Sequence, residues 1–283
     1  MTGRLERWGI IVIFVRARGS LCGVILLALL ILAGLSGCSR PDPEDTVNIA
    51  GSSSVQPLSE ELANAFMKDN PGISINVAGG GSSAGIKAAK DGTADIGASS
   101  RELSKDEEKG LVVIPIAIDG IAIVVNPENP VKSLTLKQIR GIYAGEITNW
   151  KEVGGRDGNI NAFTREEGSG TRGAFEELVM KGYRISSKVG VQNSTGSLRT
   201  AVAGDPQAVA YISLGNVNNT VKVVAVEGVT PTDETIKNGS YKLSRYFYYL
   251  TREQPREIAQ QFIDFVLSHE GQQIVGEVFV PVE

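Results

Sequence analysis

The sequence has very few of the side chains that carry enzymatic, redox and metal chemistry. Its 283 residues include two cysteines, Cys22 and Cys38, and one histidine, His269. Since both cysteines lie at or before residue 38, the rest of the chain cannot form an internal disulfide, a catalytic thiolate or a cysteine-based zinc site. No group of His, Asp and Glu has the spacing of metal ligands, so we expect neither a metal nor a cofactor.

Clusters of one charge are also missing. No block of lysine and arginine occurs, which excludes the basic surface typical of nucleic-acid-binding domains. The whole chain has 28 basic and 32 acidic residues, and residues 38–283 have 24 and 31, a net charge of −7. An anion bound by this part of the chain would therefore have to be held by local donors against a repulsive field.

One long hydrophobic run is present, near the N-terminus. Residues 21–35 are almost wholly apolar, follow a basic stretch, and lead into Leu35-Ser36-Gly37-Cys38. This order resembles the signal peptide of bacterial lipoproteins, so we predict a signal peptide over residues 1–37, lipidation of Cys38 and a tether over residues 38–46. An uncleaved membrane anchor is the alternative, for which the run is short. Both arrangements place the rest of the chain outside the cytoplasm.

Strand and helix patterns alternate through the rest of the chain. Apolar strands at 47–50, 73–77 and 95–98 are separated by segments with helical spacing, which begin at Pro57 and near Ile86. This βαβαβ order predicts an α/β fold with a parallel sheet and crossover helices. Further strands are expected at 111–118, 120–125, 160–163, 208–212, 221–226 and 246–250, and further helices at 135–143, around 175–179, and at 197–203, 253–267 and 269–276.

Three turns between a strand and a helix share one chemistry. Residues 51–54, 79–85 and 165–171 each place small hydroxyls and free backbone N–H groups at the start of a helix. Unpaired N–H donors and the partial positive charge of a helix start suit oxyanions. Serine and threonine also cap helices for structural reasons, so one such turn means little. Three turns in one chain, one with Arg165 four residues before Ser169, predict an oxyanion site.

A secreted serine hydrolase is the alternative from another functional class. Gly81-Ser82-Ser83-Ala84-Gly85 matches the G-x-S-x-G turn, and Ser83 with His269 could supply a nucleophile and a base. His269, however, lies at an expected helix start, where a solvent-facing side chain is the usual outcome. Such a short motif also occurs often by chance, so we expect no enzymatic activity. A P-loop is excluded because Gly85-Ile86-Lys87 does not have the Gly-Lys-Ser/Thr order.

Taken together, the motifs resemble the phosphate-binding proteins of phosphate-specific ABC importers, the PstS type. The resemblance covers nearly all of residues 47–283, in the same order. It is carried by GSSSVQP at 51–57, GGGSSAGIKAA at 79–89, DIGASSREL at 95–103, ITNWKEVGG at 147–155, RxxGSGTR at 165–172 and NSTGSLRTAVAGDPQAVAYISLG at 193–215.

The resemblance implies a type II periplasmic-binding-protein fold, with two α/β lobes joined by crossing strands around a ligand cleft. Lobe one would comprise residues 46–120 plus 245–283, and lobe two residues 121–244. The implied function is an extracytoplasmic lipoprotein that captures inorganic phosphate and delivers it to the membrane permease subunits of an ABC importer, as a monomer. A receptor for another tetrahedral oxyanion, such as sulfate or molybdate, is the alternative binding function.

The resemblance also implies a set of phosphate-binding residues. The Ser53 hydroxyl and the Ser54 backbone N–H would come from the first turn, and the Ser82 hydroxyl, beside Ser83, from the second. Arg165 would pair with phosphate from the other lobe. Ser169, Gly170 and Thr171 would add N–H and hydroxyl donors. Charge-assisted bonds from arginine to phosphate are the strong ones, and a dry cleft strengthens every donor.

One position departs from the family pattern. Well-known members have an aspartate where this chain has Ser100, and that carboxylate accepts the proton which phosphate retains. A hydroxyl can still accept a hydrogen bond, but it does not repel a fully ionised anion. Asp119 is the candidate replacement acceptor, or else it only closes a turn before Gly120. Arg101 would add a second cation to the site, or pair on the surface with Glu102 or Asp106.

Overall fold

The computed structural model describes residues 45–282 of the chain. The predicted signal peptide, Cys38 and most of the predicted tether lie outside these residues. Within residues 45–282, no helix is both long enough and apolar enough to span a membrane.

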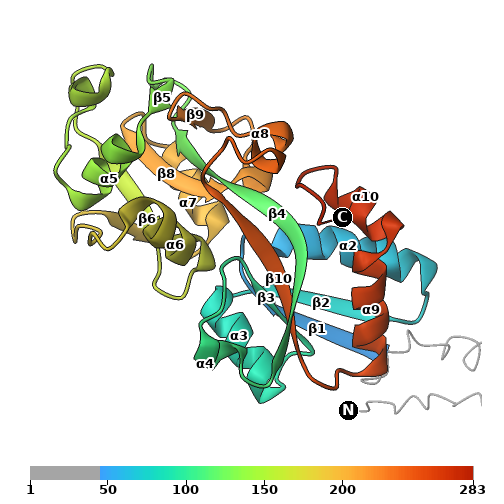
Figure 1. Cartoon of the computed structure of the whole chain (residues 1–283). Coiled ribbons are helices and arrows are strands. Elements are labelled where there is room, and N and C mark those ends of the chain that lie inside the picture. Colours follow the sequence, from blue (N-terminus) through green and yellow to red (C-terminus); the bar gives the residue numbers. More distant parts are fainter. Residues whose placement is uncertain (1–44, 283) are drawn as a thin grey trace, which may run out of the picture. The chain divides into compact units, whose positions relative to one another are not determined.

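Two groups of elements are built around two hydrophobic cores (Figure 1). The first group takes both ends of the described chain. Its elements are β1 (Thr46–Gly51), α2 (Gln56–Asp69), β2 (Ser74–Gly79), α3 (Ser82–Asp91), β3 (Ile96–Ser99), α4 (Lys105–Glu108), α9 (Glu257–Leu267) and α10 (His269–Val275).

The second group is formed by the middle of the chain. Its elements are β5 (Ser133–Leu134), α5 (Leu136–Ala144), β6 (Asn161–Arg165), α6 (Gly170–Phe175), β7 (Gly190–Gln192), α7 (Thr195–Ala203), β8 (Ala208–Ser213), β9 (Lys222–Val226) and α8 (Asp233–Lys237). Short 3-10 helices lie at Trp150–Val153 and Leu214–Asn216, and α6 continues as a π-helix over Glu176–Met180.

Two long strands belong to both groups, β4 (Leu111–Val125) and β10 (Ser244–Arg252). They pair antiparallel from Leu111 to Gly120, and the rest of β4 then pairs with β8 and β9. Residues 111–118 and 120–125 were expected as separate strands, and this was wrong, because the apolar pattern continues through Asp119 and Gly120 without a break in the ladder. Figure 1 shows β4 and β10 running side by side between the groups.

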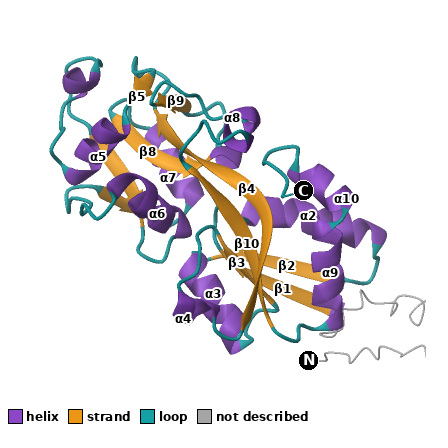
Figure 2. Cartoon of the chain, in the orientation of Figure 1, coloured by secondary structure: helices purple, strands orange, loops and turns teal. Residues whose placement is uncertain are grey.

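The strands form one mixed sheet in the order β2-β1-β3-β10-β4-β8-β6-β7, with β9 and β5 branching from β4. Parallel pairs β1–β2 and β1–β3 confirm the βαβαβ start that the sequence predicts. Helices flank the strands in both groups (Figure 2). The predicted α/β class is confirmed.

Each group has its own core, which fixes the ends of its strands. In the first, Val47 and Ile49 of β1 pack with Leu58 of α2 and Phe262 of α9, all at most 1% exposed. In the second, a larger cluster lies between the sheet and α5, with a smaller one under α7. Burial of such side chains contributes about 1.5–3 kcal/mol each, so the turns at the strand ends rest on rigid supports.

Candidate functional site

The turn after β1 is held tightly against the end of β3. Gly51 has φ +148°, and a Cβ there would lie 2.1 Å from the carbonyl oxygen of Ala98, so only glycine fits. The Ser52 N–H donates to that same oxygen at 2.9 Å. This places Ser54, fully buried, at the entry to α2, while Ser53 is half-buried beside it.

The second turn brings α3 onto the same strand ends. Gly81 precedes the helix with φ +90°, and a Cβ on Gly85 would lie 2.7 Å from the carbonyl oxygen of Ala50. Ser82 at the helix start is fully buried, whereas Ser83 is exposed. The close approach of α3 to β1 therefore places the Ser82 hydroxyl beside the first turn.

The third turn comes from the second group and meets the other two. Ser169 caps α6 by accepting the Arg172 N–H, and Gly170 and Thr171 follow it, buried. A Cβ on Gly170 would lie 2.2 Å from the Ser82 Oγ, so the two helix starts touch. The Ser83 N–H also donates to the carbonyl oxygen of Gly168 at 3.1 Å. Turns far apart in the sequence thus meet at one place.

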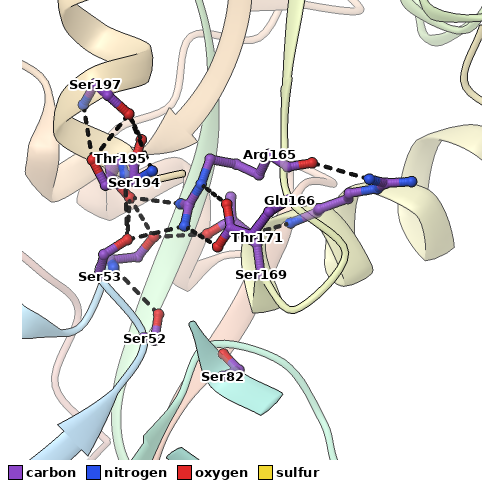
Figure 3. Close-up of polar contacts among 12 residues, drawn as sticks. Ser52, Ser53, Ser82, Arg165, Glu166, Ser169, Thr171, Ser194, Thr195 and Ser197 are labelled. Atoms are coloured by element: carbon purple, nitrogen blue, oxygen red, sulfur yellow. Dashed lines mark hydrogen bonds and ion pairs between the residues drawn. The ribbon is translucent and has the colours of Figure 1, made fainter. Parts of the chain in front are cut away.

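Hydroxyl groups from both groups bond to each other there (Figure 3). The Ser54 Oγ lies 2.7 Å from the Thr171 Oγ1 and 3.0 Å from the Thr195 Oγ1. Thr195 starts α7 and is 1% exposed. Four helix starts, those of α2, α3, α6 and α7, therefore surround this point.

Arg165 supplies the cation at this point and is 2% exposed. Its Nη1 donates to Thr195 at 3.1 Å and its Nη2 to the Ser53 Oγ at 3.1 Å. The Glu166 carboxylate takes the other edge of the guanidinium, from Nε at 2.9 Å and Nη2 at 2.8 Å (Figure 3). This fork fixes the plane of the guanidinium, so that its remaining donors face the hydroxyl groups.

The end of β6 is bonded to an aromatic stack, because the Thr164 side chain and the Arg165 backbone N–H both contact the Tyr211 hydroxyl. The Tyr211 hydroxyl bonds to Thr164 Oγ1, and the rings of Tyr211 and Phe175 stack 3.9 Å apart at 7°. Burial raises the pKa of Tyr211 to about 12, so its hydroxyl remains a neutral partner. The end of β6 is thereby fixed with its arginine directed at the turns.

Comparison with known proteins identifies the family. A model of the PBP superfamily domain matches residues 39–270. The chain is 31% identical over 267 residues to the phosphate-binding protein PstS of Borreliella burgdorferi, which covers 90% of this chain and 96% of that protein. It is 30% identical over 243 residues to PstS of Bacillus subtilis, which covers 84% and 81%. This chain belongs to the PstS family.

Solved structures agree on the fold of this PstS-family chain. A phosphate ABC transporter substrate-binding protein from Clostridium perfringens, solved with bound phosphate, is 44% identical with a TM-score of 0.82, and covers 84% of this chain and 100% of that one. An ABC-type phosphate transport receptor from Vibrio cholerae is 39% identical with a TM-score of 0.69, covering 83% and 99%. The type II periplasmic-binding-protein fold is confirmed.

Ser100 of this PstS-family chain lies among the other hydroxyls. It is fully buried, its Oγ accepts from the Ser52 hydroxyl at 2.8 Å, and its N–H donates to the Ser82 Oγ at 3.1 Å. A Cβ on Gly170 would lie 2.7 Å from the Ser100 Oγ. The structure therefore places Ser100 with Ser82 and Gly170.

Asp119 lies inside the continuous strand β4, so it does not close a turn before Gly120, and its carboxylate is bonded within the protein. Its Oδ1 accepts from the Ser213 hydroxyl and the Leu214 N–H, and its Oδ2 accepts twice from Arg245. These four donors use the lone pairs of both oxygens. Burial raises the pKa of Asp119, and the Arg245 guanidinium opposes that rise. The Asp119 carboxylate is thus bonded by protein donors on both oxygens, and the proposed ligand set does not include it.

Arg101 is bound by a carboxylate. Its guanidinium holds Glu107 with two bonds of 2.7 and 2.9 Å, and reaches the Ser83 hydroxyl at 3.3 Å. The bond from Arg101 lowers the pKa of Glu107 to about 2. Neither Glu102 nor Asp106, considered as surface partners from the sequence, is the carboxylate that Arg101 contacts, so this cation is already neutralised next to the site.

Neither the hydrolase nor a metal site finds support among residues 45–282. His269 is exposed and bonds to Gln273 in its own helix, and no hydrogen bond joins it to Ser83. No group of three or more metal-ligating side chains occurs in the same residues.

Thr195 is the residue that sequence reasoning missed. The signal was present, because Ser194 caps α7 in the same way that Ser169 caps α6. The strand before this turn could not be recognised in the sequence, because β7 has only three residues and no clear apolar pattern.

Proposed function

We propose that this chain binds inorganic phosphate and delivers it to the membrane permease subunits of an ABC importer, without catalysing a reaction. The observation that carries the proposal is the meeting of one buried arginine with hydroxyl-bearing helix starts from both core groups. Phosphate has four oxygens, and such a set of donors suits a tetrahedral oxyanion. Relatives named phosphate-binding protein support the same ligand.

The proposed ligand set lies on both sides of the crossing strands. Ser53, Ser54, Ser82 and Ser100 come from the first side, with Ser83 at the rim. Arg165, Ser169, Gly170, Thr171 and Thr195 come from the second. We propose that the sides are lobes, residues 46–120 plus 245–283 and residues 121–244, and that phosphate closes them by contacting both at once.

The proposal includes an anchor outside the cytoplasm, through a lipid on Cys38. Mass spectrometry of the N-terminus of the membrane-extracted protein shows whether this lipid is present. A diacylglycerol mass on Cys38 is expected, and its loss in Cys38→Ser. An unmodified Cys38 in wild type contradicts the anchor but leaves phosphate binding open.

Arg165→Ala tests the ligand site. Removing the main cation from a dry site is expected to weaken phosphate binding by about a hundredfold, because charged hydrogen bonds contribute about 1.5–3 kcal/mol each. The measurement is calorimetric titration of the anion-stripped protein with phosphate, with sulfate as a competitor.

Arg140→Ala is the matched control, because Arg140 is half-buried and bonds to Val179 away from the site. It should bind phosphate as wild type does. Retained tight binding by Arg165→Ala would contradict the site assignment. Equal binding of sulfate by wild type would favour a receptor for another oxyanion.

A further inference from the structure

A buried ion pair lies where the two crossing strands change from one core to the other. Asp119 of β4 and Arg245 of β10 are direct partners in the antiparallel register, and their side chains are 0% and 4% exposed. The Arg245 Nε and Nη2 donate to one carboxylate oxygen at 3.0 and 2.9 Å. Among residues 45–282, neither side chain of this pair is hydrogen-bonded to a hydroxyl group of the cluster.

The pair reaches the cluster through Ser100. The third guanidinium nitrogen, Nη1, donates to the carbonyl oxygen of Ser100 at 2.9 Å. The hydroxyl of the same residue lies between Ser52 and Ser82, facing Gly170. Arg245 therefore fixes the backbone of a residue whose side chain is in the proposed site.

The other end of the pair reaches the second core group. The free oxygen of Asp119 binds the Ser213 hydroxyl at 2.8 Å and the Leu214 N–H at 3.1 Å. Two residues later, the Asn216 side chain donates to the carbonyl oxygen of Ser54 at 3.1 Å. The short segment 213–216 thus links the ion pair to the first turn as well.

Stability alone is a weak reason for such a pair. Burying two charges costs desolvation that their attraction barely repays, and apolar residues of the same volume often serve as well. Here the remaining donor of Arg245 contacts Ser100, a proposed ligand residue. The remaining acceptor of Asp119 contacts the segment 213–216, which in turn bonds to the carbonyl oxygen of Ser54. A network with every member satisfied defines one geometry, and an altered member disturbs the others.

We propose that Asp119 and Arg245 are positioning residues of the anion site. Asp119 orients the Arg245 guanidinium, and Arg245 holds Ser100 in place under Gly170. The segment 213–216 ties the same carboxylate to the Ser54 turn. The pair thereby sets the affinity for phosphate without contacting it. This inference rests on the proposed function.

Arg245→Lys is the first test. Lysine retains the charge beside Asp119, but one ammonium group cannot replace the fork and reach the Ser100 carbonyl as well. We expect phosphate affinity, measured by calorimetry on the full chain, to fall about tenfold. Asp119→Asn retains the size of the side chain and should give a loss in the same direction. If Asp119→Asn does not fold, Arg245→Lys carries the test.

The decisive measurement is whether the effects of Arg245→Lys and Ser100→Ala on phosphate affinity are independent of each other. If Arg245 acts by placing the Ser100 side chain, the double variant Ser100→Ala/Arg245→Lys should bind about as well as Ser100→Ala alone. Losses that multiply, to about a hundredfold if each single variant loses tenfold, would overturn the inference. So would unchanged affinity in Arg245→Lys, even with a lowered melting temperature.

Asp95→Asn is the matched control. Asp95 pairs with Arg256 at 3.1 Å within the first group, away from the junction. Its loss should lower the melting temperature and leave phosphate affinity unchanged. A wild-type chain that does not bind phosphate would overturn the proposed function together with this inference, whereas normal wild-type binding with an unaffected Arg245→Lys overturns the inference alone.

Discussion

At the scale of single residues, most polar groups at the proposed site are uncharged hydroxyls. The Ser54 hydroxyl, for example, lies 2.7 Å from the Thr171 hydroxyl and 3.0 Å from the Thr195 hydroxyl. Arg165, the cation bonded to these hydroxyl groups, is already paired with Glu166. An arriving anion would therefore be held mainly by dipoles fixed at helix starts, which cost no reorganisation when the charge arrives.

Thr195→Val tests the residue that the structure adds to this set. Valine has nearly the same shape but offers no partner to Arg165 or Ser54, so phosphate affinity should fall about tenfold for a lost charged bond of about 1.5 kcal/mol. Calorimetric titration with phosphate measures this affinity. Thr200→Val, on the exposed face of the same helix, is the control and should bind normally. Equal affinities in both variants would remove Thr195 from the site.

The ion pair of Glu107 should make the free energy of unfolding depend on pH in the acid range. Its pKa falls to about 2 when folded, chiefly through the bond from Arg101, against 4.5 as its ordinary value. A carboxyl group whose pKa is lowered by folding stabilises the folded state at pH values above its ordinary pKa. This stabilisation is lost as the pH falls toward 2. Solvent screening reduces the effect to about 1 kcal/mol.

Urea unfolding of Glu107→Gln from pH 7 to pH 3 measures this term. The variant should be less stable by about 1 kcal/mol at pH 7, and the gap from wild type should narrow below pH 4.5. Its neighbour Glu108, which makes no ion pair among residues 45–282, provides the control variant Glu108→Gln. A gap that stays constant with pH would contradict the ion-pair origin.

At the scale of elements, the position of α3 decides where Ser82 lies. Gly85 allows the helix to approach β1 and β3, since a Cβ there would lie 2.7 and 2.8 Å from the carbonyl oxygens of Ala50 and Ala98. These contacts are with backbone, which cannot move aside as a side chain does.

Gly85→Ala should therefore push α3 outward. We expect a loss of about 1–3 kcal/mol in unfolding free energy, together with weaker phosphate binding. Gly80→Ala is the control, because its Cβ would meet only the Ala84 Cβ at 3.7 Å. Chemical denaturation and calorimetry measure both variants. Normal binding by a destabilised Gly85→Ala would show that the Ser82 position does not depend on this contact.

The order of elements could be predicted from the sequence because strands and helices have different apolar periods. The turns at residues 51–54, 79–85 and 165–171 were predicted for the same reason, because each interrupts the apolar period of the elements beside it. The register between β4 and β10 could not be predicted, because nothing in the sequence indicates that Asp119 pairs with Arg245, which lies 126 positions later. Without that partner, the sequence leaves Asp119 as a candidate acceptor for phosphate.

At the scale of the whole molecule, the proposed function requires motion between the two core groups. Their elements are joined through β4 and β10, and polar contacts such as Ser54 to Thr171 connect them across the site. Phosphate that bonds to both sides should shift the population toward closed forms. Small-angle X-ray scattering should then show a smaller radius of gyration with phosphate.

The change in radius should follow the same concentration dependence as the calorimetric binding. Arg165→Ala at the same phosphate concentration is the control and should show no change. A radius that does not respond in wild type, despite normal calorimetric binding, would mean that the two sides are already fixed relative to each other.

The junction of the crossing strands has one more consequence. The Ile121 N–H donates to the carbonyl oxygen of Leu243 at 2.7 Å, so the chain enters and leaves the second core group at one point. A segment whose two ends meet can be transplanted as a cassette. Residues 121–243 of a relative could replace those of this chain, pairing a foreign arginine and α6 with the native serines. The anion preference measured for such hybrids would show how much of it comes from each half of the protein.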